Sequence, residues 1–564
     1  MSTHDGASEH TSSTRSAAPA NSQIDGQVDG QFDAVRLEVI WSRLISIVDE
    51  AAKAIVRTSF STLANEANDF ACVLTDASGR SIAQNTGSIP SFIATLPATV
   101  RHFIDEIGLD AMRPGDVLIT NDPWKGTGHL SDVCIVKPIF LGEKIVAFAS
   151  SAAHVPDIGG RLRALESRQV FEEGLQIPLM KLIDAGQVDA TLVKMIRQNV
   201  RTPEQTIGDI WAQLSANELM ARRITELMID YELDDLGPFT NEILRRAERA
   251  MRDAIRAVPD GSFEFAFDTD GADEPYHFAV SLTIEDDAIR VDYSGTSATQ
   301  PRAINCVMAY TFAMTAYAIK CVLAPDLPNN DGMFRPIEVR APQDTILNPR
   351  YPAAVVARAN TGHYVPLCVF GALQKVLPEK VMAAAGSPLW VFTVTGTRED
   401  GRSFANVLFY NGGLGATAHD DGESCLSWPS NISSTPVEVA ERNGPLLCHY
   451  KRLRVGSGGD GRQRGGLGQE IAFESTSERP LVGLFMAERT RFAAPGFDGA
   501  LAGAAGAVEI NGKPINTHIQ HILAHGDVVV LRSPGGGGYG DPNERGAELI
   551  ARDCLLGYIE NEGE

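Results

Sequence analysis

The sequence predicts an α+β fold: a large, multi-segment unit with a helix-rich, mixed-sheet N-terminal half and a β-rich C-terminal half. Three observations lead to this prediction. Apolar residues recur at helical spacing over residues 33–60 and again over 190–253. Short strand-like runs lie between these two segments. After residue 259, apolar and polar residues alternate, and glycine and proline become frequent.

The N-terminal part divides into a tail and a folded region. Residues 1–32 are polar, nearly free of large apolar side chains, and predicted to be a disordered tail, because they bury too little surface to offset chain entropy. An amphipathic helix follows from Asp33 to Phe60. Strands are then predicted at 70–75, 117–120, 133–136 and 145–149, and helices over 190–253 with a break at 234–238. These elements form a predicted α/β region over residues 33–258.

The C-terminal part, residues 259–564, is predicted to be β-rich. Apolar residues alternate in three runs, at 263–267, 278–284 and 289–293, which indicates an antiparallel meander. A helix of small and aromatic residues is expected at about 303–323. The remainder consists of short strands between glycine-rich and proline-rich segments, with no internal repeat.

Composition excludes several classes of function. The 564 residues carry a net charge of −23 and no long basic cluster, so nucleic-acid binding is not expected. The eight cysteines form no CxxC pair, which excludes a zinc ribbon or a thioredoxin motif. The N-terminus lacks the apolar core of a signal peptide, and no run of 18 apolar residues occurs. We therefore expect a cytoplasmic protein without membrane contact.

Two glycine clusters, at 456–468 and 533–540, invite a nucleotide-binding interpretation. Neither ends in the Gly-Lys-Ser/Thr of a phosphate-binding loop, and neither opens a helix after a strand. The first holds Arg462 and Arg464, so it could cradle an anion, while the alternative for both clusters is tight turns that use positive φ angles. Ser457 lies among these glycines without the local signature of a nucleophile.

Two short stretches suggest a metal site. His129 is followed three residues later by Asp132, and His154 is followed three residues later by Asp157, in both cases near glycine. A mixed set of imidazole and carboxylate ligands suits a borderline divalent metal that keeps positions open for water or substrate. The alternative is two ordinary turns with hydrogen-bonded polar residues. The occurrence of both stretches 25 residues apart favours the metal site only together with the family resemblance described below.

A series of motifs extends this pattern over nearly the whole chain beyond the tail. They lie at 58–61, 68–70, 121–123, 129–132, 153–154, 157–160, 173–174, 177–178, 199–201, 208–209, 293–296, 334–336, 435–438, 456–468 and 534–542. In this order they resemble the hydantoinase B family, which also includes the C-terminal half of oxoprolinase and the alpha subunits of acetone carboxylase-type enzymes. The chain departs from the commonest family pattern at residues 126–128 and at Ser131.

The resemblance implies one half of an ATP-dependent complex. A hydantoinase A-type partner would bind ATP with Mg²⁺ and phosphorylate an amide or enol oxygen, and the B-type polypeptide would carry a divalent metal (Mn, Zn or Fe) and complete the reaction. A heterotetramer with two copies of each chain fits the family. The absence of a nucleotide loop motif from this sequence agrees with that division of work.

The resemblance also assigns residues. His129, Asp132 and His154 are the implied metal ligands, and Asp69 is a fourth ligand or a catalytic base. Asp157 is the second candidate base, and it or Asp122 could orient an imidazole. Asp69, Asp122 and Asp157 each have a structural alternative, which is to stabilise a turn. His363 and His419 could line the substrate cavity or be hydrogen-bonded surface groups.

The implied reaction is ring opening of a lactam, hydantoin or oxoproline-like amide. Amide resonance makes such a ring a poor electrophile, and phosphorylation of its oxygen would provide a good leaving group. A metal-bound water, with its pKa lowered toward ~7, would attack the activated carbon, and Asp69 or Asp157 would take the proton. Two alternatives stay open: the alpha chain of an ATP-dependent ketone carboxylase, and a non-catalytic structural subunit whose metal only stiffens the loops.

Overall fold

A computed structural model describes residues 33–560, apart from 163 and 273. Its N-terminal layer is an antiparallel seven-stranded sheet with the order β2-β1-β5-β4-β3-β6-β7. The strands are β1 (Phe70–Asp76), β2 (Ser81–Gln84), β3 (Val117–Thr120), β4 (Asp132–Leu141), β5 (Lys144–His154), β6 (Met180–Asp184) and β7 (Gln187–Val188). All four strands predicted for this part of the chain are present. β4 and β5 are longer than predicted, because helices cover both faces of the sheet and their buried residues do not alternate with polar ones.

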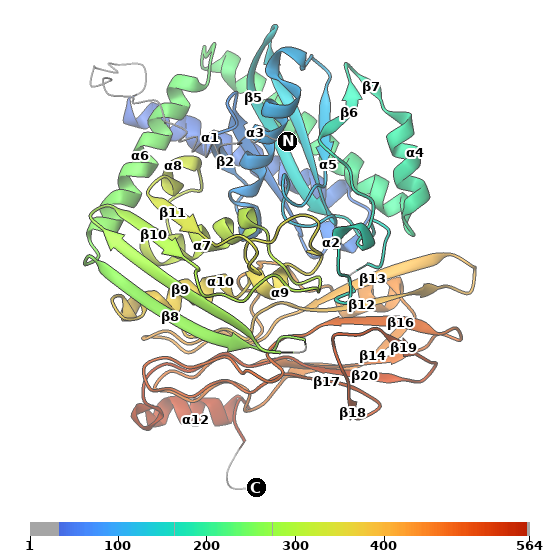
Figure 1. Ribbon diagram of the computed structural model, residues 1–564, viewed down its shortest axis with the longest axis vertical. Helices are drawn as coiled ribbons and strands as arrows, with labels where there is room; N and C mark the ends of the chain where they lie inside the picture. Colours follow the sequence, from blue (N-terminus) through green and yellow to red (C-terminus); the bar gives the residue numbers. More distant parts are fainter. Residues whose placement is uncertain (1–32, 163, 273, 561–564) are drawn as a thin grey trace, which may run out of the picture.

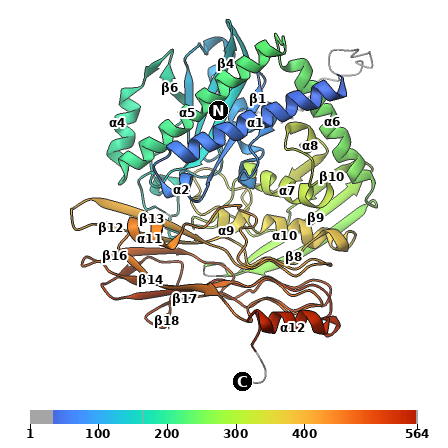
Figure 2. The ribbon, with the colours of Figure 1, turned by 180° about the vertical axis from the view of Figure 1, so that it is seen from behind.

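Helices α1 (Ala34–Thr58) and α5 (Pro203–Asp230) pack together across one face of this sheet (Figure 2). The Asp33 side chain caps α1, and the buried stripe of α1 has the predicted helical spacing. Helix α3 (Thr95–Ile107) packs on the opposite face. Beyond them lie α2 (Thr62–Asn65), α4 (Ala190–Asn199) and α6 (Gly237–Arg256), and the predicted break separates α5 from α6.

A second, four-stranded sheet follows, with the order β11-β10-β9-β8. Its strands are β8 (Gly261–Thr269), β9 (Tyr276–Glu285), β10 (Ala288–Asp292) and β11 (Ile337–Arg340). The first three form the predicted antiparallel meander, and β11 adds in parallel to β10. Helices α7 (Met308–Leu323), α8 (Asp331–Phe334), α9 (Ala359–Gly362) and α10 (Val365–Leu373) lie between this sheet and the rest of the molecule (Figure 1).

The start of α7 differs from the prediction. The helix was expected from about residue 303, but residues 303–307 form no helix and α7 begins at Met308. The Asn305 side chain holds this segment in place, since its amide donates to the carbonyls of Gln300, Arg302 and Ala354. These bonds fix a non-helical backbone that leads into α7.

Two further sheets form stacked layers at the C-terminal end (Figure 1). One has the order β13-β12-β16-β19, and the other β14-β15-β20-β17-β18. A shared core that includes Trp390, Phe392, Phe473 and Leu531 lies between them. The strands are β12 (Trp390–Thr397), β13 (Ser403–Tyr410), β14 (Leu446–Leu453), β15 (Gln469–Ser475), β16 (Leu481–Met486), β17 (Ala507–Ile510), β18 (Lys513–Pro514), β19 (His521–Leu523) and β20 (Val528–Arg532), with α11 (Val437–Asn443) and α12 (Ala547–Leu555) beside them.

The two glycine clusters pack against each other, backbone on backbone. A Cβ atom on Gly465 would lie 2.0 Å from the carbonyl oxygen of Gly536, so only glycine fits there. Arg464 is buried against Asp553, and Arg462 pairs with Glu544. Both guanidinium groups that suggested an anion cradle are therefore engaged inside the chain.

The largest hydrophobic core crosses the predicted boundary between residues 258 and 259. It joins Leu96 of α3 with Tyr310 of α7 and Phe497 of the C-terminal part. The domain division stays a prediction, and in the structure its boundary falls between α6 and β8. The predicted tail at 1–32 lies outside the described residues. Within the part of the chain that the structure describes, no helix is long and apolar enough to cross a bilayer.

Candidate metal centre

Three strand ends meet at one edge of the seven-stranded sheet. In the hairpin of β4 and β5, Asp132 at the start of β4 lies directly opposite His154 at the end of β5. β1 flanks β5 on its other side, and the backbone N–H of His154 donates to the carbonyl of Asp69, just before β1, at 3.0 Å. Asp69, Asp132 and His154 are therefore neighbours because of strand pairing alone.

His129 completes a compact triad with Asp132 and His154. His129 Nε2 lies 2.7 Å from Asp132 Oδ1, and His154 Nδ1 lies 2.9 Å from the same oxygen. One potential ligand atom from each of the three side chains lies within 4.8 Å of the others, and all three residues are buried. Two imidazole nitrogens and a carboxylate oxygen that converge in this way match the donor set of a divalent zinc, manganese or iron ion.

The loop that carries His129 is fixed by the Asn121 side chain. The Asn121 amide donates to the carbonyls of Leu130 and Leu175, and its oxygen accepts the Ile177 N–H. Asp122 accepts the Trp124 N–H and thus caps the turn, which is the structural alternative given above for this residue. Gly128 has a φ of +108°, and a Cβ atom there would lie 2.7 Å from Arg358 Cδ. This glycine lets Arg358 approach the loop closely.

The other nitrogen of His129 is also engaged. His129 Nδ1 lies 2.9 Å from the carbonyl oxygen of Val356, which can only accept, so the ring donates there, and an ion bound at Nε2 would take the place of a proton on that nitrogen. Glu173 holds the Val356 peptide in place, since its Oε1 accepts the N–H groups of Val355 and Val356 at 2.7 and 2.9 Å. Burial raises the pKa of Glu173 to about 8. Glu173 therefore fixes the Val356 peptide, and the Val356 carbonyl in turn sets the orientation of the His129 ring.

Arg358 is a site residue that the sequence did not indicate. Its Nη2 donates to Asp132 Oδ2 at 2.6 Å, its Nε donates to the Thr127 carbonyl at 2.9 Å, and its guanidinium lies 4.6 Å from the Tyr310 ring centroid. Burial alone would raise the pKa of Asp132, but His129 and Arg358 hold that pKa well below its usual range. Burial and the Arg358 charge lower the pKa of His129. An ionised carboxylate beside a neutral imidazole is the protonation state that metal ligands need.

The remaining predicted residues fall at different places. Asp69 lines the cavity of the triad, with its Oδ2 3.9 Å from His154 Nδ1. Asp157 accepts hydrogen bonds from Gly159 and Arg201 and is not among the residues that line this cavity. His363 is buried and lines the cavity, and burial lowers its pKa to about 3. His419 is exposed and pairs with Glu379.

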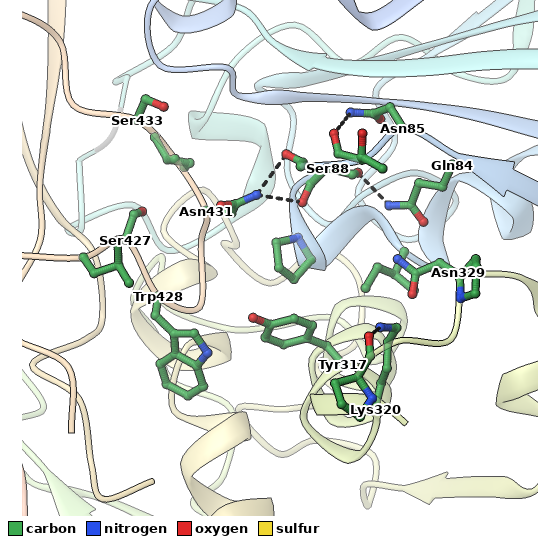
Figure 3. A pocket seen from close by; sticks show the side chains of 18 of the residues that line it. Gln84, Asn85, Ser88, Tyr317, Lys320, Asn329, Ser427, Trp428, Asn431 and Ser433 are labelled. Atoms are coloured by element: carbon green, nitrogen blue, oxygen red, sulfur yellow. Dashed lines mark hydrogen bonds between the residues drawn. The ribbon is translucent and has the colours of Figure 1, made fainter. Parts of the chain in front are cut away.

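The triad faces a small cavity that adjoins a large chamber. The cavity has a volume of about 40 Å³, and Ile89, Phe92 and Ile432 close one side of it. The chamber has a volume of about 840 Å³ and is formed by residues 84–93, 317–329 and 425–434, together with Ile45 and Asn411 (Figure 3). Ile432 lines both spaces. The two spaces therefore adjoin at this side chain.

Comparison with known proteins shows the family of this chain. The family model for hydantoinase B/oxoprolinase matches residues 33–542. The chain belongs to the hydantoinase B/oxoprolinase family. The family resemblance seen in the sequence is thereby confirmed.

Several known proteins align with most of this chain. An uncharacterized protein of Methanocaldococcus jannaschii is 31% identical over 92% of this chain and 93% of its own length. The B subunit of a putative D-/L-hydantoinase from a Pseudomonas species is 28% identical over 94% of both chains. The crystal structure of an ATP-dependent caprolactamase from Pseudomonas jessenii covers 95% of this chain and 96% of its own, with a TM-score of 0.84 at 25% identity.

Proposed function

We propose that this chain is the B-type component of an ATP-dependent hydrolase that opens cyclic amides, and that His129, Asp132 and His154 hold its divalent metal. The convergence of two imidazoles on one oxygen of the buried Asp132 carries this proposal. The names of two relatives, a putative hydantoinase and an ATP-dependent caprolactamase, support the substrate class and the ATP requirement.

The partner in this proposal is a hydantoinase A-type polypeptide that binds ATP and Mg²⁺, in a heterotetramer with two copies of each chain. It phosphorylates the amide oxygen of the ring. The Pseudomonas relative that aligns over 94% of this chain is itself named as one subunit of a hydantoinase, which supports a division between two polypeptides. This chain would then receive the activated ring.

A divalent ion at the triad would supply Lewis acidity, which polarises an oxygen and lowers the pKa of a water. The surrounding side chains prepare the site for it. Arg358 and Thr127 both donate to Asp132 Oδ2, which keeps the carboxylate ionised while its Oδ1 faces the imidazoles. Glu173 and Val356 fix the tautomer of His129.

Two further side chains are positioned to handle protons and hydrogen bonds. Asp69, whose carboxylate lines the cavity beside His154, is the proposed proton acceptor for the attacking water. Asp157, the second candidate, acts in this proposal through Arg201 and the turn at Gly159 instead. His363 Nδ1 accepts the Leu389 N–H, so its neutral ring carries the proton on Nε2 and can donate to a substrate oxygen in the cavity.

The proposed reaction balances with two waters. The first adds to the phosphorylated ring carbon, and the ring C–N bond breaks as a proton passes to the nitrogen. The second hydrolyses the resulting acyl phosphate to a carboxylate and inorganic phosphate. Lactams would yield amino acids, and hydantoins would yield carbamoyl amino acids.

The test is turnover by the complex of this chain with its partner. Lactams and hydantoins are expected to stimulate ADP release together with ring-opened product. ADP release with a ketone that requires bicarbonate would indicate carboxylation instead. Full ring-opening activity in a His129→Ala variant would support a purely structural role for this chain.

A further inference from the structure

A separate pocket lies where the N-terminal and C-terminal parts of the chain meet. It has a volume of about 590 Å³, and none of the described residues that line it lines the cavity of the triad or the chamber. One side is formed by residues 61–63, 156 and 201–205, and the other by residues 398, 402–407, 442 and 443. Figures 1 and 2 both show α2 above β13, and Figure 2 shows α11 beside β13.

Four arginines line this pocket, although the net charge of the chain is −23. The four are Arg201, Arg398, Arg402 and Arg442. Glu204 is the one carboxylate among the described residues of the wall, and it is paired at 2.6 Å with Arg197, which does not line the pocket. The wall is therefore cationic in a molecule that is acidic as a whole.

Two of the four arginines have carboxylate partners. Arg201 pairs with Asp157 at 2.9 Å, and Arg402 pairs with Asp400 at 2.5 Å. Each pair cancels its own formal charge, so these two arginines add little net charge to the pocket.

Arg398 and Arg442 have no carboxylate partner among the described residues. Arg398 donates to the Asn443 carbonyl at 2.5 Å and lies 5.2 Å from the centroid of the Phe404 ring, so its guanidinium is held in place without being neutralised. Arg442, the neighbour of Asn443 near the end of α11, is exposed and forms no ion pair or side-chain hydrogen bond within the described part of the chain. Two uncompensated guanidinium groups in one pocket favour an anion, and a phosphate dianion matches their combined charge.

The remaining wall suits the organic part of a ligand. Leu63, Pro156, Pro203 and Val407 supply apolar surface. Helix α5 begins in the same wall without a side-chain cap, and its dipole adds a weaker attraction for negative charge. A volume of about 590 Å³ lies within the range of small-molecule sites and leaves room for more than a phosphate ion.

We propose that this pocket binds a phosphorylated small molecule, whose phosphate group is held by Arg398 and Arg442 and whose organic part contacts the apolar wall. This site is distinct from the proposed reaction centre, and the inference does not depend on the proposed function. The wall nevertheless continues into the metal centre, since the Leu63 carbonyl accepts the Asp69 N–H at 2.9 Å and Pro156 follows His154 by two residues. A ligand bound here would contact segments that position the metal centre.

Equilibrium binding to the full chain tests this assignment. The main probe is phenyl phosphate, which joins a phosphate group to an apolar ring, and it is compared with inorganic phosphate, ADP and uncharged phenol. Dissociation constants are measured by calorimetry for the wild type, Arg398→Gln, Arg442→Gln, the double variant and His154→Ala. Arg249→Gln is the matched control, because Arg249 is also exposed and without an ion pair among the described residues, but lies on α6 away from the pocket.

We expect each single arginine variant to bind phenyl phosphate about tenfold more weakly than the wild type, since each loses one charged donor. The double variant should show no measurable binding, whereas Arg249→Gln and His154→Ala should match the wild type. Inorganic phosphate should bind more weakly than phenyl phosphate, and added salt should weaken both. Tighter binding of ADP that also depends on Arg398 and Arg442 would support the site and identify nucleotides as its ligands.

Equal affinities for phenyl phosphate in the wild type and Arg442→Gln would overturn the assignment, as would phenol that binds as tightly as phenyl phosphate. Arg442→Gln keeps the test decisive even if Arg398→Gln does not fold, because the Arg442 side chain makes no hydrogen bond or ion pair within the described part of the chain. Loss of binding in His154→Ala but not in Arg442→Gln would place the phosphate at the triad instead. Absence of ring opening by the complex would leave this assignment standing.

Discussion

The triad cavity and the chamber adjoin each other at Ile432 but are built on different physical principles. The cavity is about 40 Å³ and is walled in part by Asp132, Arg358 and three imidazoles, all buried. The chamber is about 840 Å³, and its wall combines amides, hydroxyls, apolar side chains and two aromatic rings. In the cavity the ligating and charged groups are paired with one another, whereas the chamber wall includes one cation and one anion, Lys320 and Asp326, whose formal charges cancel.

This difference indicates a separation of tasks. Fixed, paired charges in a small space preorganise an electrostatic environment for chemistry. A large, nearly neutral space with aromatic side chains in its wall can accept a ligand without a charge requirement. Substitutions in the cavity should therefore change metal affinity and kcat, while substitutions in the chamber should change ligand affinity and KM.

The largest expected effect comes from removing a triad ligand. In His154→Ala, we expect kcat of the complex to fall on the order of a thousandfold, because a metal contributes several kcal/mol and each 1.4 kcal/mol is tenfold. Binding of the cyclic amide, measured without ATP, should persist. Steady-state kinetics and calorimetry measure the two quantities, and His419→Ala, on the surface, is the control. If His154→Ala lost both kcat and binding of the cyclic amide, the cavity and the chamber would not have separate tasks.

Arg358→Met should mainly affect stability. The substitution leaves the buried Asp132 carboxylate without its cation, a loss of about 3–5 kcal/mol in unfolding free energy. Urea denaturation measures it. Arg350→Met, which removes an exposed pair with Asp344, should cost less than about 1 kcal/mol. Similar losses in the two variants would show that Arg358 is not essential to the cavity.

Glu173 should act on the metal at a distance. In Glu173→Met, the Val355 and Val356 N–H groups lose their acceptor, and metal affinity should fall about 10–100-fold, as it does when groups that orient a ligand are removed. Glu173→Gln keeps an oxygen in the same position and should restore most of that affinity. Metal titration with a competing chelator distinguishes the two variants. Equal affinities in both would argue against the orienting role.

The smallest effect concerns a buried carboxyl group that lies in neither region. Burial and, to a smaller extent, the charge of Asp270 raise the pKa of Glu488 to about 8, against the opposing effects of Asn360, Arg489 and Arg491. The folded protein thus holds a proton that the unfolded chain releases near its ordinary pKa. This contribution to stability is complete at low pH and is lost as the pH rises toward 8, at about 1 kcal/mol per pH unit.

Glu488→Gln should flatten this dependence. Unfolding midpoints measured between pH 6 and 9 should fall less in the variant than in the wild type. Metal affinity and ring binding should be the same in both proteins. An unchanged slope would show that Glu488 is ionised in the folded protein.

The sequence came close to the site because strand pairing is partly readable from it. Asp132 lies ten residues before Gly142 and His154 eleven residues after Glu143, so a hairpin at this turn brings both to one end. The facing register depends on an irregularity between Ile139 and Phe140. Without it, Asp132 would face Ala153, and the His154 side chain would point to the other face of the sheet. Nothing in the local sequence predicts that irregularity.

Arg358 and Glu173 escaped sequence reasoning for a different reason. Arg358 lies 226 positions from the carboxylate it contacts, and Glu173 lies 182 positions from the Val355 peptide it holds. No periodicity or spacing encodes such contacts, since they follow from how the helical segment at α9 packs under the sheet edge. Glu173 belonged to a family motif, but its role as the support of the Val356 peptide required the structure.

The position of a metal ion in crystals of the full chain tests the central claim most directly. Anomalous difference density collected from protein grown with Mn²⁺ or Zn²⁺ is predicted to show one strong peak at about 2.0–2.3 Å from nitrogens of His129 and His154 and an oxygen of Asp132. A peak bound elsewhere, with these three side chains still bonded only to one another, would contradict the account.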